Sequence, residues 1–276
     1  VIEDFQNEAF DPYQAYQEGQ LANHFRPAID DVEAATRRRV RRASWNINMV
    51  RAPFAWRFGN YGQGTKVAVI DTGCGPTPYL RVKGGVSYVP GTTSWRDDQG
   101  HGTHVAGTIA GLPIRFGRPP IDYFYSVAPL ASVYAVKVLD RTGRGKLSWI
   151  LNGLSWCLRN RMDVVNLSLG SVAKANTGCN RAYEIIGHRL TRRGSVLVAA
   201  AGNSGRNPSL RYVGNPARCR PFIAVGALDR RGRRANFSCF GPQLELAAPG
   251  VGVSSLRPKI GFQTLSGTSM AAPHVA

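Results

Sequence analysis

The chain has 276 residues, 43% of them hydrophobic, which is enough for one large domain or two small ones with a substantial core. No apolar run is long enough to span a membrane, and the five cysteines match no metal-ligand spacing such as Cys-x-x-Cys. The composition therefore excludes a helical membrane span and a cysteine-ligated zinc domain. The sequence does not begin with Met, so we expect any export signal to lie outside it.

Charge is distributed unevenly along the chain. The formal net charge is +18, but the first 34 residues carry eight acids and one base, so the rest carries +25. This asymmetry predicts an acidic segment that can lie against a basic body, and it permits binding to polyanions. The alternative is that the arginines only keep the protein soluble.

Residues 1–36 are polar and aromatic without a clear period, and they precede the basic run Arg-Arg-Arg-Val-Arg-Arg at 37–42. A run of like charge is normally solvated and open to proteases. We expect residues 1–42 to be a pro-segment remnant or linker with a basic processing site. A solvated linker or a nucleic-acid-binding patch is the alternative.

From Thr65 onward, short apolar strands alternate with amphipathic stretches, which is typical of βαβ units and a parallel sheet covered on both faces. The expected strands are 66–70, 132–139, 164–169, 196–201 and 222–227. The expected helices are 101–112, 148–160 and 181–192, with one more beginning at Ser269. The sequence therefore predicts one α/β domain over residues 43–276, built as a three-layer sandwich around a central, mostly parallel sheet.

Polar side chains stand where these elements end or begin. Asp71 ends the first strand, His101 opens the first helix, and Asn203 lies in a glycine-rich turn after the strand 196–201. Ser269 lies in the first turn of the last helix, with an exposed hydroxyl and an unused backbone N–H. Each has a plainer interpretation alone: Asp71 as a cap, Asn203 as a turn residue and Ser269 as a helix N-cap. We expect His104, one turn after His101, to be a buried core histidine.

Together the four residues have the chemistry of one acyl-transfer site, because the carboxyl ends of parallel strands meet at one edge of a sheet. Asp71 would hold His101 in the required tautomer, and His101 would take the proton of Ser269. The Asn203 amide and the Ser269 N–H would hold the oxyanion. From the free imidazole value, activity should rise near about pH 6–7.

Four motifs in this order resemble the subtilisin-type serine proteases, the subtilase family, over about residues 44–276. They are Val69–Gly73, His101–Gly107, Ala200–Asn203 and Gly267–His274, with connecting stretches at Tyr134–Leu139, Asp163–Gly170 and Leu244–Gly250. The resemblance implies a subtilisin-like fold, with Asp71, His101 and Ser269 as the catalytic residues and Asn203 in the oxyanion hole.

The same resemblance implies a cleft that binds the substrate as an added strand. Its edges would be Ser168-Leu169-Gly170 and Gly143-Arg144-Gly145, with Leu147 in a distal pocket. A roomy, apolar main pocket would be left by three small residues, namely Ala200, Gly202 and Gly214. Arg144 is unusual at this edge and would favour acidic residues nearby; the alternative is an arginine that points into solvent. Asn215-Pro216 resembles a cis-proline turn of the family.

Some positions depart from the family pattern. Tyr79 stands where close relatives bring an aspartate to a structural calcium, so that site is in doubt. Cys179 and Cys219 are placed like a disulfide of some secreted relatives. Cys74 resembles a thiol of other relatives, although a small buried side chain is the plainer interpretation.

Only seven residues follow Ser269, fewer than its helix should need, so we expect the catalytic domain to be incomplete at the C-terminus. The resemblance implies a secreted, monomeric serine endopeptidase made as a zymogen, with no cofactor for its chemistry. Its substrates would be polypeptides, cut with broad specificity after large apolar residues, and its own pro-segment would be an inhibitor. One alternative is a catalytically weak or silent relative that binds polyanions; a convertase-like preference for basic pairs would need an acidic pocket.

Overall fold

The computed structural model describes residues 26–27, 41–116 and 121–276. A seven-stranded sheet with the order β11-β10-β9-β8-β3-β7-β4 forms its centre, and every neighbouring pair in it is parallel. The strands, in the order of the sheet, are β11 (Leu246–Pro249), β10 (Ile223–Leu228), β9 (Val196–Ala200), β8 (Val164–Leu167), β3 (Lys66–Asp71), β7 (Ser132–Lys137) and β4 (Val82–Ser87). The expectation of a mostly parallel central sheet is confirmed.

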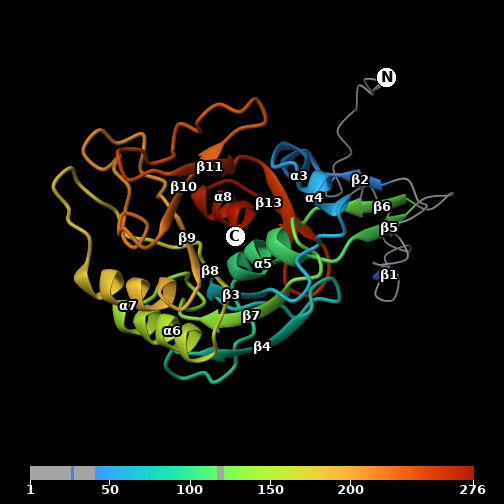
Figure 1. Cartoon of the computed structure of the whole chain (residues 1–276), viewed down its shortest axis with the longest axis horizontal. Coiled ribbons are helices and arrows are strands. Elements are labelled where there is room, and N and C mark those ends of the chain that lie inside the picture. Colours follow the sequence, from blue (N-terminus) through green and yellow to red (C-terminus); the bar gives the residue numbers. More distant parts are fainter. Residues whose placement is uncertain (1–25, 28–40, 117–120) are drawn as a thin grey trace.

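Helices cover both faces of this sheet (Figure 1). On one face lie α6 (Leu147–Arg159) and α7 (Arg181–Thr191), and on the other α5 (His101–Ala110) and α8 (Thr268–Val275). Successive residues of β3 point to opposite faces, so Ala68 and Ile70 pack in the core beneath α6 and α7, whereas Val67 and Val69 pack beneath α5. The structure is thus a three-layer sandwich with a separate apolar core on each face.

Smaller elements flank the sandwich. A four-stranded sheet has the order β1-β5-β6-β2 and consists of β1 (Arg26–Pro27), β5 (Ile114–Phe116), β6 (Ile121–Phe124) and β2 (Arg41–Ala43). Beside it lie the short helices α3 (Trp45–Met49) and α4 (Ala52–Trp56). The antiparallel pair β12 (Val253–Leu256) and β13 (Phe262–Leu265) leads into α8. None of the described helices is long and apolar enough to cross a membrane.

The five strands and four helices expected from the sequence are all present, with bounds that shift by about two residues at most. The two edge strands were missed. Strand β4 contains two glycines and is only partly buried, and β11 ends in a proline, so neither has the apolar pattern of a central strand. Most of the predicted pro-segment, including residues 37–40 of the basic run, lies outside the described residues. Its last residues, Arg41 and Arg42, belong to β2, which pairs with β6.

The disulfide joins the start of α7 to the loop that precedes β10. Cys179 and Cys219 are bonded at 2.11 Å and are separated by 40 residues in sequence. Hydrogen bonds connect the same two segments, from the Asn180 N–H to Asn215 Oδ1 at 2.9 Å and from Asn215 Nδ2 to the Gly178 carbonyl at 3.2 Å. The Asn215–Pro216 bond beside this link is cis. The link therefore fixes two segments that are distant in the chain.

Removing this disulfide should destabilise the domain without altering its fold. For the double variant Cys179→Ala/Cys219→Ala we expect the free energy of unfolding to fall by about 2–4 kcal/mol, because the unfolded chain regains the entropy of a long loop. Urea unfolding of both proteins measures the difference. Reductant should lower the midpoint of the parent protein and leave that of the variant unchanged; equal stability of the two proteins would contradict the expectation.

Candidate active site

The predicted acid and base meet at the carboxyl edge of the sheet. Asp71 is the last residue of β3 and is fully buried, and His101 is the first residue of α5. His101 Nδ1 lies 2.8 Å from Asp71 Oδ1, which also accepts the Thr72 N–H at 2.7 Å. Asp71 Oδ2 has no partner among the described residues. This contact fixes the imidazole so that its Nε2 side is turned toward the open side of the site.

The beginning of α5 approaches β3 very closely, and only glycine fits there. A Cβ on Gly102 would lie 2.1 Å from the Gly73 carbonyl oxygen and 3.1 Å from the Asp71 Cβ. The Gly102 N–H instead donates to Thr72 Oγ1 at 2.9 Å. The glycine that follows His101 in sequence is therefore what allows the helix to bring its first side chain to the strand end.

A second carboxylate, Asp97, connects the strand end to the helix start. It is 7% exposed, and its Oδ1 accepts hydrogen bonds from Thr72 Oγ1 at 2.9 Å and from the Gly100 N–H at 2.8 Å. Its Oδ2 accepts the Thr103 N–H at 2.8 Å and the Thr103 hydroxyl at 2.5 Å. Asp97 thus holds both the residue after Asp71 and the first turn that carries His101.

Burial and charge act in opposite directions on His101. Burial lowers the pKa of its imidazole, but the charge of Asp71, the hydrogen bond to Asp71 and the charge of Asp97 together raise it above the usual 6.5. His104 differs, as expected for a core histidine: it is fully buried, and desolvation lowers its pKa to about 3. Its Nε2 lies 3.0 Å from the Val253 carbonyl oxygen and 3.1 Å from that of Gln263.

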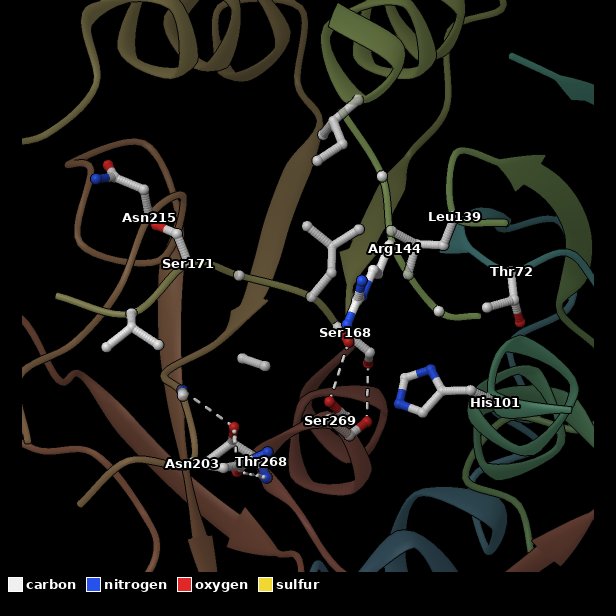
Figure 2. A pocket seen from close by; sticks show the side chains of 18 of the residues that line it. Thr72, His101, Leu139, Arg144, Ser168, Ser171, Asn203, Asn215, Thr268 and Ser269 are labelled. Carbon is white, nitrogen blue, oxygen red and sulfur yellow. Dashed lines mark hydrogen bonds between the residues drawn. The ribbon is translucent and has the colours of Figure 1, made fainter. Parts of the chain in front are cut away.

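Ser269 lies in the first turn of α8 and opens onto the same cleft as His101. Its hydroxyl donates to the Ser168 carbonyl at 3.0 Å, while the Ser168 hydroxyl donates to the Ser269 carbonyl at 2.8 Å. In Figure 2, the imidazole of His101 is directed toward Ser269 from a different side than Ser168, and the dashed lines join Ser269 only to Ser168. The structure thus brings the two side chains together, with the serine hydroxyl turned toward the neighbouring carbonyl.

Asn203 is held by Thr268, the residue before the serine (Figure 2). Asn203 Oδ1 accepts the Thr268 N–H at 2.9 Å and the Thr268 hydroxyl at 3.0 Å, which assigns the oxygen and the nitrogen of the amide. Its Nδ2 then has no hydrogen-bond partner among the described residues, and it lies beside Gly267. Both this amide and the first-turn N–H of Ser269 are donors that a developing oxyanion could use.

These groups line one cleft of about 1050 Å³. Most of the predicted substrate residues line it, namely Gly143, Gly145, Leu147, Ser168, Leu169, Gly170, Ala200 and Gly202. Further apolar lining, which sequence reasoning did not identify, comes from Leu139, Ile150, Val172 and Tyr183. They were missed because each reads as an ordinary core or loop residue: Ile150 lies on α6, Tyr183 on α7, and Leu139 and Val172 in the segments that follow β7 and β8.

Gly214 is a correction, because it does not line the cleft. Its Cα lies against the Ser171 carbonyl oxygen, which a Cβ would approach to 1.8 Å, and its N–H donates to the Ala201 carbonyl at 3.0 Å. The glycine allows the segment 170–171 to pack against it, and it therefore supports the cleft wall from behind.

The calcium site that the family resemblance would imply does not fit the residues present at Tyr79. Its ring is 3% exposed and packs in the core beneath α5, and a phenol cannot replace a carboxylate ligand. The described part of the chain also contains no group of three or more His, Cys, Asp or Glu side chains placed to hold a metal.

Sequence reasoning also missed the residues that hold the predicted site in place: Thr72, Asp97 and Thr268. An acid just before a predicted helix start was the available signal for Asp97. Lys137 belongs to the same group; it is 1% exposed and donates to the Thr72 carbonyl at 2.5 Å and to Asp98 at 2.6 Å. These roles are hard to see in the sequence, because Asp97 reaches Thr72, Thr268 reaches Asn203 and Lys137 reaches Thr72 and Asp98 from another segment of the chain.

Substituting Asp97 should loosen the Asp71–His101 pair and change its titration. For Asp97→Asn we expect kcat/KM to fall on the order of 10- to 100-fold, because a small displacement of the base is costly. The charge of Asp97 helps to raise the pKa of His101, so the acidic limb of the pH profile should move to lower pH. Measuring kcat/KM from pH 5 to 9 tests both effects.

The matched control is Asp163→Asn, which removes the same charge next to the first residue of β8, at the opposite edge of the sheet. It should leave the acidic limb in place. If the acidic limb of the pH profile of Asp97→Asn coincides with that of the parent protein, the role given to Asp97 is wrong.

Comparison with known proteins agrees with this geometry. The subtilase family model matches residues 62–276. A thermostable alkaline protease of Halalkalibacterium halodurans is 44% identical over 232 residues, which is 84% of this chain and 60% of that protein. Subtilisin BL of Lederbergia lenta is 48% identical over 232 residues, covering 84% of this chain and 81% of its own. An alkaline protease of Shouchella clausii is 46% identical over 252 residues, with coverages of 91% and 62%.

The chain thus spans about three fifths of two of these relatives and four fifths of the third. The four sequence motifs, the parallel sheet with helices on both faces and the extent of these matches point to the same assignment. The chain belongs to the subtilase family, the subtilisin-like serine proteases.

Proposed function

We propose that this protein is a serine endopeptidase that hydrolyses peptide bonds through an acyl-enzyme on Ser269. The observation that carries the proposal is the 2.8 Å contact between the buried Asp71 and His101, with the imidazole opening onto the cleft that contains Ser269. A base that is oriented by a carboxylate and faces a serine hydroxyl is the arrangement that acyl transfer needs.

In the first half of the reaction, the Ser269 oxygen attacks the peptide carbonyl carbon while His101 Nε2 takes the hydroxyl proton. Asp71 stays ionised and stabilises the imidazolium that forms. When the tetrahedral intermediate collapses, the carbon–nitrogen bond breaks and His101 gives its proton to the leaving amine. A water molecule then repeats the sequence on the acyl-enzyme and releases the second product and the serine.

The resting position of the serine adds one step to this sequence. The Ser269 hydroxyl donates to the Ser168 carbonyl at 3.0 Å, so this hydrogen bond has to break before His101 can accept the proton. Catalytic hydrogen bonds are often loose in unliganded sites and shorten when substrate binds. We infer that substrate entry releases the serine from Ser168.

The oxyanion would be held by two donors whose positions are fixed before the reaction begins. Thr268 holds the oxygen of the Asn203 amide, which leaves Nδ2 as a donor, and the Ser269 N–H lies in the first turn of α8. Donors that need no reorganisation stabilise a developing charge more than mobile ones do.

Substrate preference follows from the walls of the cleft. An extended peptide would lie between the edges 143–145 and 168–170, and large apolar side chains before the cut would meet Leu169, Ala200 and Gly202. We propose broad specificity with a preference for such residues. No acidic residue is among those that line the cleft in the described structure, so a preference for basic pairs has no support there.

We also propose the setting in which the enzyme works. The Cys179–Cys219 disulfide favours an oxidising, extracellular compartment. The acidic first 34 residues and the basic remainder support inhibition by the protein's own pro-segment. The basic remainder also supports binding of the protein surface to polyanions. We propose in addition that the enzyme acts as a monomer.

The nucleophile can be tested by covalent labelling. A fluorophosphonate should react with Ser269 and with no other serine, because this hydroxyl and the imidazole of His101 line the same open cleft. His101→Ala should abolish the labelling, whereas His188→Ala, which changes an exposed histidine on α7, should leave it unchanged. Peptide mass mapping locates the adduct. An adduct on another residue, or equal labelling of the His101 variant, would overturn the assignment.

The pH dependence should report the raised pKa of His101. The ring stays protonated to higher pH than free imidazole, so kcat/KM should reach half of its plateau above about pH 6.5. His104 and His274, with pKa values lowered to about 3 and about 4 by burial, stay neutral throughout and do not contribute. Histidine NMR titration beside the kinetic profile identifies the group. A kinetic midpoint at or below the free imidazole value would count against this prediction.

A further inference from the structure

The cleft contains a single permanently charged side chain, Arg144. Twenty-four residues line the cleft, and among them Arg144 is the only lysine or arginine, while no aspartate or glutamate is present. The other ionisable groups there are His101, the proposed base, and Tyr183, whose pKa burial raises to about 12 so that it stays neutral. The cleft therefore carries one fixed positive charge among side chains that are otherwise uncharged or, in His101, titratable. This charge lies on the edge opposite residues 168–170.

The loop that carries Arg144 is well fixed. The Arg144 N–H donates to Asp140 Oδ1 at 3.1 Å, and the Arg144 carbonyl accepts the Asp140 N–H at 2.8 Å. Gly145 packs against the segment that follows β7, where a Cβ would lie 2.3 Å from the Val138 carbonyl oxygen. Because Gly143 and Gly145 have no side chains, the position of Arg144 alone determines what this edge presents to a ligand.

The guanidinium of Arg144 is available to a ligand. It has no hydrogen bond or ion pair among the described residues. The nearby Asp140 accepts the Thr142 N–H at 2.8 Å, the Thr142 hydroxyl at 2.6 Å and the Arg144 N–H through its Oδ1, and the charge of Arg144 contributes to lowering the pKa of Asp140 without an ion pair between the two side chains. Figure 2 shows the Arg144 side chain directed from its edge over the cleft toward the side of Ser168.

We propose that Arg144 is a specificity-determining residue that makes this cleft select peptides with an aspartate or glutamate close before the cut. The inference rests on the proposed peptidase function and adds a substrate class to it. A peptide laid along 143–145 passes beside the guanidinium, which can bind a carboxylate with two parallel hydrogen bonds. The formal net charge of +18 adds a long-range attraction for acidic peptides.

The test uses matched peptides that differ by one charge. Internally quenched peptides with Phe before the cut carry either Asp or Asn at the second, third or fourth position before it. We expect kcat/KM to favour Asp over Asn by about two- to fivefold for at least one position, which is the range of an exposed ion pair. Arg144→Gln should bring that ratio to about one, Arg144→Glu should reverse it, and high salt should reduce it in the parent protein.

The matched control is Arg141→Gln, which removes the same charge from the same loop at an exposed position that does not line the cleft. It should keep the Asp/Asn ratio of the parent protein. If Arg141→Gln lowers the ratio as much as Arg144→Gln does, the preference comes from the overall field of the protein and the role given to Arg144 is wrong.

A binding measurement keeps this inference separate from the proposed function. The Ser269→Ala variant should bind the fluorescent Asp peptide more tightly than the Asn peptide, whether or not the parent protein turns either over, and Arg144→Gln in that background should remove the difference. Cleavage of both peptides with equal kcat/KM and equal binding overturns the role of Arg144 and leaves the peptidase intact. Unequal binding without cleavage supports Arg144 and overturns the peptidase.

Discussion

The contact between the buried carboxylate of Asp71 and the imidazole of His101 is the interaction on which the rest of the site depends. A fully buried carboxylate loses its hydration, and here the Thr72 N–H and His101 replace that hydration in part. The same contact raises the pKa of His101 against the opposing effect of burial, so the protein is built to favour the imidazolium. A charge pair of this kind works only if its two partners cannot move apart, and Asp97 supplies that constraint through Thr72 and the first turn of α5.

The parallel sheet converts this local contact into a site. Strands β3 and β9 end at the same edge, and α5 and α8 begin there, so Asp71, His101, Asn203 and Ser269 converge although nearly 200 residues separate the first from the last. Close packing of α5 on the sheet is needed for this convergence, because Gly102 lets the start of α5 approach the end of β3. The disulfide and the hydrogen bonds between Asn180, Gly178 and Asn215 link the two segments on the far side of the cleft.

The cleft combines apolar walls and glycine edges with one charged side chain. Its apolar lining includes Ile150 on α6 and Tyr183 on α7, and its glycine edges suit an extended peptide. Arg144 places a positive charge at the substrate edge, and Tyr79 is a buried phenol that packs in the core beneath α5. Substrate choice is therefore the property that we propose Arg144 to set.

The sequence by itself determined the central strands, the main helices and the identity of the four polar residues at their ends, because apolar periodicity and residue type are local properties. The edge strands β4 and β11 escaped it, since partial burial weakens that pattern. Only the tertiary structure placed Gly214 behind the cleft wall, turned the Ser269 hydroxyl toward Ser168, and gave Asp97 and Thr268 their supporting contacts. These outcomes depend on which atoms from distant segments come within hydrogen-bonding distance, and no local pattern along the chain encodes that distance.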